Sequence, residues 1–342
     1  MTGLNERKQK ILRAVVTDYI QTAEPVGSRT LSRHYQLALS AATIRNEMAD
    51  LEELGFLKQP HTSAGRIPSQ QGYRFYVDSL MDEAELTPQE KLYLEKFFTQ
   101  LQKMREIDQI VQQVAKALSV LTRYTSLVLA PRLKQCAFAQ MRLVPIDEKQ
   151  ALVVLITDTG YIRNKVIKMP RALSADELDS VVAYLNEELA GQTIAGLTAA
   201  RMRKLRTDLY SRVDILHSLL AMLEECSSDE ENRIFLGGTS NILDQPEFKD
   251  MEKVKHLLTL FEEGERLTFI LETAPAGVTI RIGTENLLAE MHDCSLVTAS
   301  YHLHGRPLGT IGVLGPTRME YARVTTIIKE MTERLNTLIS TL

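Results

Sequence analysis

The sequence has no tryptophan, three cysteines and no long hydrophobic run. Cys136, Cys226 and Cys294 lie too far apart for a C-x-x-C site, and their odd number does not suit a disulfide scaffold. The longest apolar run, ALVVLI at 151–156, is far shorter than the ~20 residues that a membrane-spanning helix needs. The first ten residues are polar and do not resemble a secretory signal. We therefore expect a cytoplasmic protein without a membrane partner.

The composition is ordinary for a globular protein, but the charge is unevenly distributed. The 342 residues, 44% hydrophobic and 25% charged, fit two or three domains and exclude collagen-like, mucin-like and broadly disordered chains. Residues 1–76 contain ten Lys/Arg and seven Asp/Glu, a net charge of +3, so the remainder carries −7 of the total −4. A small basic module on an acidic body is a common plan for DNA binding, because phosphate neutralisation acts locally.

The N-terminal region predicts three helices. Apolar residues recur on one face over 11–20, and the turn at 24–27 contains a proline that ends this helix. Ser28 is the expected N-cap of a short second helix. Ser40 is the expected N-cap of a third helix, and Gly55 is its expected end. Two helices joined in this way behind a longer one indicate a helix-turn-helix.

The start of the third helix carries residues suited to reading bases. Ala42 and Thr43 are small enough for close approach, Arg45 suits guanine and Asn46 suits adenine. The alternative is a plain helical bundle in which Arg45 and Asn46 are merely solvated.

The segment after this helix predicts a β-hairpin wing. A strand-like run at 56–60 leads to a tip of small residues and returns through Arg66-Ile67-Pro68. Thr62, Ser63 and Arg66 are candidates for contacts with phosphates or the minor groove, and the backbone of Gly65 permits close approach. The alternative is that Ser-Ala-Gly simply makes a turn. A nucleotide-binding loop is excluded, because no G-x-x-x-x-G-K pattern is present.

Three segments resemble one known family. SAATIRNEMADLEELGFL at 40–57, HTSAGRIPSQQGYRFYVD at 61–78 and the C-terminal run at 295–324 closely resemble the HrcA family of bacterial heat-inducible transcription repressors. The resemblance implies a homodimer that binds an inverted-repeat operator in double-stranded DNA upstream of chaperone operons. It also implies a winged-helix head, a GAF-like body and a dimerisation domain inserted into that body. Heat would remove active repressor, and a GroEL-type chaperonin would restore it.

The rest of the chain alternates helical and strand-like segments. Capping boxes at 87–90 and 174–177 predict helix starts, and a long helix is expected over 199–225. The expected strands are 126–130, 136–145, 151–157, 161–169, 233–236, 267–272, 278–282, 293–304 and 308–314, with further helices at 107–121, 247–263 and 319–342.

These patterns, with the resemblance, predict an α+β multidomain protein. We expect a winged-helix DNA-binding domain at 1–76 and connecting helices at 77–124. The GAF-like α/β body is expected at 125–171 and 273–342, interrupted by a helix-rich α+β dimerisation domain at 172–272.

Other constellations are weaker. The Gly-Gly-Thr-Ser-Asn run at 237–241 resembles a phosphate-binding loop only loosely, and a simple turn is the favoured interpretation. His302 and His304 alternate on one strand near Cys294 and His292, but nothing fixes a complete set of metal ligands. The basic cluster at 201–206 is typical of a solvated helix face. No catalytic motif is present, so we expect no enzyme, no cofactor and no metal.

The leading hypothesis is a dimeric repressor in which Thr43, Arg45 and Asn46 contact bases. One alternative is a protein-interaction adaptor that uses the winged fold without DNA. The other is a small-molecule sensor whose GAF-like domain controls the head. The residues expected to contact phosphates or the minor groove are Arg29, Arg33, Lys58, Thr62, Ser63, Gly65 and Arg66.

Overall fold

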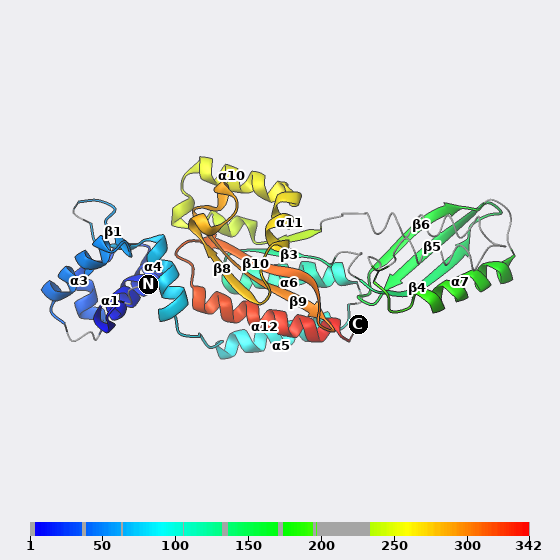
Figure 1. The fold of residues 1–342 in the computed structure, drawn as a ribbon, viewed down its shortest axis with the longest axis horizontal. Coiled ribbons are helices and arrows are strands. Elements are labelled where there is room, and N and C mark those ends of the chain that lie inside the picture. Colours follow the sequence, from blue (N-terminus) through cyan, green and yellow to red (C-terminus); the bar gives the residue numbers. More distant parts are fainter. Residues whose placement is uncertain are drawn as a thin grey trace.

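The computed structural model describes residues 4–35, 39–62, 64–104, 106–131, 136–169, 174–193, 196 and 233–341. Three parts follow one another along its long axis (Figure 1): a head of residues 4–80, a central body, and a distal unit within 136–193. Helices and several sheets occur together, so the predicted α+β class is confirmed. No helix in the described ranges is both long and apolar enough to span a membrane.

The head contains a three-helix group, a short ribbon and a connecting helix. The ribbon strands pair antiparallel, Leu57 with Pro68 and Lys58 with Ile67. The elements are α1 (Glu6–Thr22), α2 (Ser28–His34), α3 (Ala41–Glu53), β1 (Leu57–Lys58), β2 (Ile67–Pro68), α4 (Gln70–Phe75) and a π-helical turn (Tyr76–Leu80).

Local signals explain most helix ends in the head. The Ser40 hydroxyl accepts a hydrogen bond from the Thr43 N–H and caps α3 as predicted. Gly55 follows α3 with φ +82°, a backbone conformation that favours glycine. The predicted cap at Ser28 is wrong, because Ser28 is the first helical residue and Gly27 occupies the cap position without a side-chain hydrogen bond. The backbone pairing of Val26 with Arg66 holds the preceding chain extended.

The body is built on a five-stranded sheet. All neighbours are antiparallel, in the order β7-β3-β10-β9-β8, so the sheet joins strands that are far apart in the sequence. Its strands are β3 (Thr125–Leu129), β7 (Ile234–Gly237), β8 (Val278–Ile282), β9 (Cys294–Leu303) and β10 (Arg306–Pro316).

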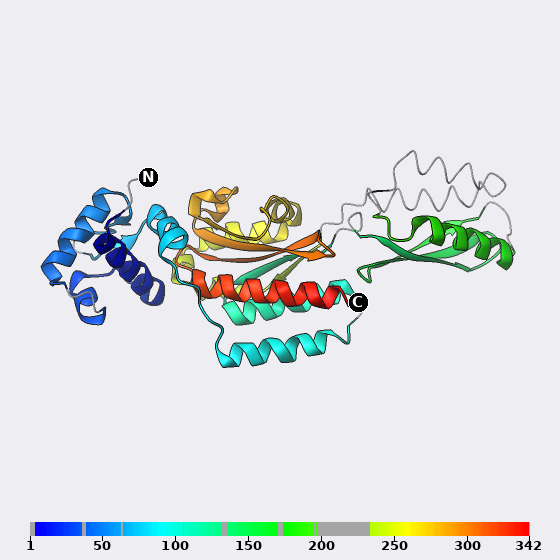
Figure 2. The same cartoon turned by 60° about the horizontal axis from the view of Figure 1, so that its bottom comes forward.

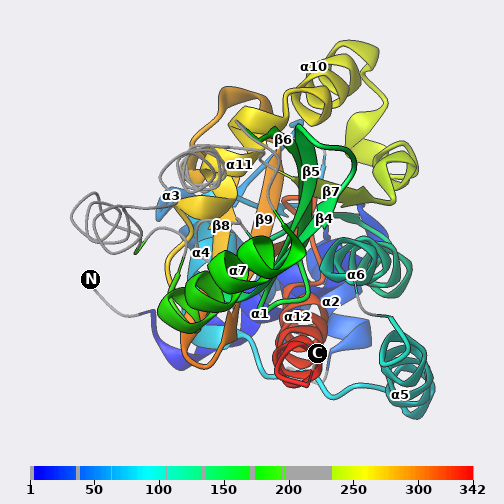
Figure 3. The same ribbon diagram turned by 90° about the vertical axis from the view of Figure 1, so that its right-hand side faces the viewer.

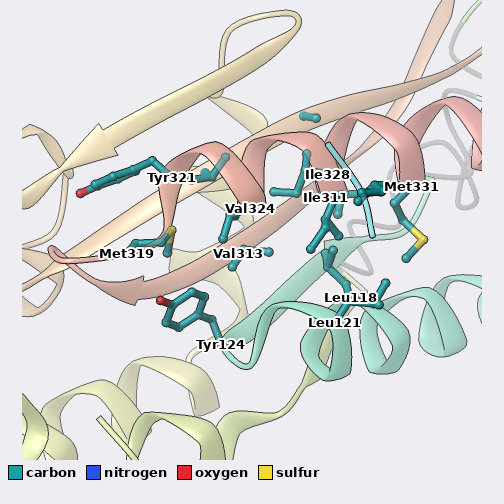
Figure 4. Packing of buried hydrophobic residues seen from close by; sticks show 14 of the residues in the cluster. Leu118, Leu121, Tyr124, Ile311, Val313, Met319, Tyr321, Val324, Ile328 and Met331 are labelled. Atoms are coloured by element: carbon teal, nitrogen blue, oxygen red, sulfur yellow. The ribbon is translucent and has the colours of Figure 1, made fainter. Parts of the chain in front are cut away.

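Helices cover both faces of this sheet (Figure 2). Helices α6 (Ile107–Thr122) and α12 (Tyr321–Ile339) lie on one face, with α5 (Pro88–Leu101) outside them. Helices α10 (Met251–Glu262) and α11 (Gly264–Glu272) lie on the other. Successive strand residues point to opposite faces, so the sheet separates two apolar cores. Figure 4 shows the first core around Leu118, Ile311, Val313, Val324 and Ile328.

The distal unit has its own core. A three-stranded antiparallel sheet is formed by β4 (Phe138–Pro145), β5 (Gln150–Thr157) and β6 (Ile162–Lys168). Helix α7 (Ala175–Leu189) packs on one face of it, as seen from the end of the molecule in Figure 3. Residues of these four elements bury one another in a separate apolar cluster.

This arrangement differs from the predicted division of the chain. We expected β4, β5 and β6 in the body, with an insertion beginning at residue 172. Instead these strands lie outside the body sheet, while β7, α10 and α11 belong to the body. The reason is that β3 is paired on both edges, with β10 and with β7, so β4 cannot pair with the strand that precedes it.

A second difference concerns 267–272, which we expected as a strand. The segment lies in α11, with Leu267, Ile270 and Leu271 buried and Phe269 56% exposed. This spacing fits one face of a helix, but periodicity alone does not distinguish a short apolar helix from a buried strand. The predicted helix over 199–225, its basic cluster and Cys226 lie outside the described residues.

Candidate nucleic-acid interface

Helix α3 lies at the end of the head away from the body (Figure 1). One of its faces is anchored by Ile44, Met48 and Leu51, which are all buried. Arg45 and Asn46 are exposed near the N-terminal end of the helix. The apolar face therefore fixes the direction in which these two side chains project.

Several predicted residues line one hollow between α2, α3 and the ribbon. Its volume is about 490 Å³, and it brings together Arg29, Arg45, Thr62, Gly65 and Arg66. These residues are separated by up to 37 positions in the sequence, so tertiary packing alone makes them neighbours.

The remaining predicted residues lie around this hollow or outside it. Arg33 is exposed one turn after Arg29 on α2, and Lys58 is exposed on β1. The Thr43 hydroxyl lies 2.9 Å from the Ser40 hydroxyl and takes part in the helix cap. Ser63 lies outside the described residues.

The ribbon is fixed to the turn between α1 and α2. Val26 and Arg66 exchange two backbone hydrogen bonds of 2.9 Å each. A Cβ atom on Gly65 would lie 2.3 Å from the carbonyl oxygen of Val26 and 2.8 Å from that of Pro25. Gly65 therefore has a structural reason to be glycine, in addition to the approach to DNA that we expected. Gln59, which the sequence analysis missed, donates to the carbonyls of Thr62 and Ala64 at 3.0 Å and shapes the ribbon loop.

Two acidic groups of α3, Glu47 and Asp50, pair with cations of α1. The Lys8 ammonium on α1 lies 2.7 Å from both Glu47 and Asp50, and Arg7 lies 3.3 Å from Glu47. The hydrogen bonds that the Lys8 ammonium donates to Asp50 and Glu47, the first being the larger cause, raise the pKa of Lys8. Since these partners are 39 to 42 positions apart, the sequence pattern gave no sign of the pairing.

Unlike the paired acidic groups of α3, most of the cations around the start of this helix have no ion-pair partner among the described residues. Within the described residues, Arg29, Arg33, Arg45 and Lys58 form no ion pair. Arg66 differs from these four cations, because its guanidinium lies 2.7 Å from a carboxylate oxygen of Glu52. The four unpaired cations and the positive end of the α3 dipole create a surface that attracts anions.

The other constellations give no competing site in the described part of the chain. No group of three or more His, Cys, Asp or Glu there is placed to hold a metal ion. Asn241 in the 237–241 run donates to the carbonyls of Tyr124 and Ser119, which fits a structural turn. Burial raises the pKa of the Cys136 thiol to about 11 and also raises that of Cys294, so neither thiol ionises readily.

Comparison with known proteins identifies the class. The family model "HrcA protein C terminal domain" matches residues 108–325. The heat-inducible transcription repressor HrcA of Natranaerobius thermophilus is 51% identical over 333 residues, which cover 97% of this chain and 96% of the relative. That of Pelotomaculum thermopropionicum is 42% identical over 336 residues, with 97% and 96% covered. A crystal structure of a hypothetical protein at 2.2 Å resolution shares the fold, with a TM-score of 0.66, 24% identity and 99% of both chains covered.

These relatives are transcription repressors, a class whose partner is DNA, and their names agree with the expectation of a regulator rather than an enzyme. The chain belongs to the HrcA family of heat-inducible transcription repressors. The resemblance noted in the sequence is thereby confirmed.

Proposed function

We propose that the chain represses heat-shock chaperone operons by sequence-specific binding to double-stranded DNA, with α3 as the recognition helix of a winged helix-turn-helix. The observation that carries the proposal is the charge arrangement on the head. Cations on α2, α3 and β1 are unpaired within the described residues, whereas Glu47 and Asp50 of α3 are neutralised from α1. Phosphates would meet positive charge where α3 begins and little repulsion beyond it.

The residues then divide into two roles. Arg45 reads guanine and Asn46 reads adenine in the major groove, with Thr43 beside them. Backbone and minor-groove contacts position the head but carry little sequence information. The residues assigned to these contacts are Arg29, Arg33, Lys58, Thr62, Ser63, Gly65 and Arg66.

Binding to an inverted repeat requires two heads related by a two-fold axis. We assign the dimer contact to the face of the distal sheet opposite α7, with a second copy of this chain as the occupant. Val144, Leu152 and Val166 lie side by side in register on three neighbouring strands, and Val144 and Val166 are each 50% exposed. Ile162 on the same sheet is 53% exposed. An exposed apolar face of this kind is typical of an interface.

The five-stranded body would be the GAF-like domain.

The proposal includes a control by temperature, which the family resemblance implies. Heat would unfold the repressor and release the operon, and a GroEL-type chaperonin would refold it. This control requires only marginal stability and a poorly refolding unfolded chain. Operator binding that survives prolonged heating without chaperonin would contradict it.

The direct test is fluorescence anisotropy with three duplexes at two salt concentrations. The duplexes carry an intact inverted repeat from a chaperone promoter, one half-site, and a scrambled sequence. We expect tight binding to the intact repeat alone. Equal, salt-sensitive binding to all three, unchanged by added chaperonin, would exclude a sequence-specific repressor, and no binding to any would favour the adaptor.

A second candidate function is small-molecule sensing by the body. A hollow of about 680 Å³ beside β9 and β10 is lined by polar groups including Ser300, His302 and Thr310, together with Leu308. A ligand that binds the native state there would raise the melting temperature. Thermal shifts across a metabolite panel, followed by operator binding with any hit, separate this function from simple repression.

A further inference from the structure

Side chains of the head pack directly against the body, in addition to the chain that connects the two parts. We call this contact, centred on Tyr73 and Arg74 of the head and Tyr321 and Glu285 of the body, the joint. Tyr73 of α4 is 3% exposed, and its ring centroid lies 6.0 Å from that of Tyr321 at the start of α12. Apolar residues of the head and of the α6/α12 side of the body form one continuous buried cluster. The joint therefore has an apolar centre that holds the two parts together.

Arg74 fixes the orientation of the head relative to the body at this joint. The Arg74 Nε atom donates to Glu285 Oε1 at 2.9 Å, and Nη2 donates to Glu285 Oε2 and, at 2.7 Å, to the carbonyl of Ile280. Nη1 donates to Asp78 at 3.0 Å. Glu285 is itself fixed, because its Oε2 accepts the Ile282 N–H at 2.9 Å. A two-point arginine–carboxylate pair of this kind holds the angle between its partners as well as their distance.

Two more polar contacts surround this pair. The Gln70 side-chain oxygen accepts from both the N–H and the hydroxyl of Thr284, at 3.0 and 2.9 Å. Gly283 has φ +56°, and a Cβ atom there would lie 2.6 Å from that same oxygen. Arg318 of the body donates to the carbonyl of Ile20 at 3.2 Å, in the last turn of α1, which has no basic residue of its own.

We infer that Arg74 and Glu285 are positioning residues that fix the head on the body and so set the distance between the two recognition helices of a dimer. The inference rests on the proposed function. A dimer binds both half-sites strongly only when its two heads match their separation. Neither residue is among those assigned to DNA, and the pair lies on the side of the head that faces the body. The pair therefore determines which half-site spacing the repressor accepts, without determining which bases it reads.

The test uses the full-length protein and duplexes that carry the inverted repeat of a chaperone promoter with its natural spacer, with spacers shortened or lengthened stepwise, or as a single half-site. Glu285→Gln keeps the shape of the side chain and removes its charge. We expect its affinity for the natural spacing to fall roughly ten-fold and its preference among spacers to flatten, because two-site avidity depends on geometry. Half-site affinity should stay within about two-fold, since the reading surface is untouched.

Glu290→Gln is the matched control, because it breaks the ion pair of Glu290 with Arg266 within the body, at 2.9 Å, and leaves the joint alone. Gln70→Ala, which weakens the joint without a change of charge, should flatten the spacer preference in the same direction. An unchanged spacer preference in both joint variants would overturn the inference. An equal loss of half-site affinity would also overturn it, because the pair would then support the fold of the head. A wild-type protein indifferent to the intact repeat would instead overturn the proposed function.

Discussion

Two faces of the head use the same residue type in opposite ways. On the side facing the body, the Arg74 guanidinium donates hydrogen bonds to Glu285, to Asp78 and to the carbonyl of Ile280. Away from the body, Arg29 and Arg45 form no ion pair within the described residues. A paired guanidinium fixes the geometry of its neighbours, whereas an unpaired one keeps its charge for a phosphate or a base edge. The comparison teaches that the partners of an arginine, more than its presence, indicate its task.

The largest expected effect comes from the centre of the joint. Tyr73→Ala should lower the free energy of unfolding by about 3–5 kcal/mol, because it removes a large buried ring. Urea denaturation followed by circular dichroism measures this change. Tyr73→Phe is the control: the Tyr73 hydroxyl is buried without a hydrogen-bond partner in the described part of the chain, so its removal should cost little or stabilise the protein. Equal losses for the two variants would contradict a packing role.

On the outward face, Arg45→Ala should lower operator affinity by about 1–3 kcal/mol and relax base preference at one position. The free energy of unfolding should change by less than ~0.5 kcal/mol, because the side chain is exposed. Anisotropy titrations with the operator and single-base variants measure the first effect. Lys10→Ala removes an exposed cation of α1 outside the hollow and should leave affinity nearly unchanged. Operator binding unaffected by Arg45→Ala would remove α3 from the recognition role.

The ribbon connects the outward face to the turn between α1 and α2. Gly65→Ala should destabilise the protein by about 1–3 kcal/mol and weaken DNA binding, because the added Cβ would lie 2.3 Å from the Val26 carbonyl oxygen. Thermal melts and half-site titrations of the same preparation measure both effects. Gly264→Ala is matched in chemistry but meets no atom within 4 Å, so it should have little effect. If both substitutions behaved alike, the tight approach would not explain Gly65.

A smaller and less specific effect is expected for the exposed cation of β1. Lys58→Ala should weaken binding to the operator and to scrambled DNA by the same factor, and the dependence of log affinity on log salt should become shallower by about 1. Titrations at several salt concentrations distinguish this behaviour from that of Arg45→Ala. A loss confined to the operator would assign Lys58 to base reading instead.

The smallest expected effect tests whether Lys8 of α1 neutralises the carboxylates of Glu47 and Asp50 on α3. Lys8→Gln should lower affinity for all DNA by about two- to three-fold, since Asp50 would lose the ammonium beside it and Glu47 would keep only Arg7. Because Lys8 is not expected to touch phosphate, the salt dependence should keep the slope of the wild type. A shallower slope, like that of Lys58→Ala, would show that Lys8 contacts the backbone directly.

Local signals predicted several helix ends in the head and the start of α5 in the body. Ser40, Gly55 and the capping box at 87–90 each act within a few residues, so their effect can be read from the sequence. The cap at Ser28 was predicted wrongly because the contact that shifts it, between Val26 and Arg66, spans 40 positions. The strand predicted at 267–272 failed for a related reason: six residues satisfy either period, and only packing against the body sheet selects the helix.

The candidate site shows the same division. The sequence was enough to select Arg45 and Asn46 as candidates for base contacts, because their position near the start of a helix is local information. The sequence could not predict that Arg66 pairs with Glu52 or that Lys8 neutralises Glu47, because these contacts join residues 14 and 39 positions apart and form only in the folded head.

The sequence by itself determined the order of most elements, the caps of α3 and α5, the basic character of the first 76 residues and the family. Only the tertiary structure decided which cations are paired, that β7 returns to β3 so that β4, β5 and β6 form a sheet of their own, and how the head is oriented on the body. The physical reason is range. Helix caps and periodicity depend on neighbours within about two turns, whereas sheet edges, ion pairs and joints depend on which distant surfaces meet when the core is buried.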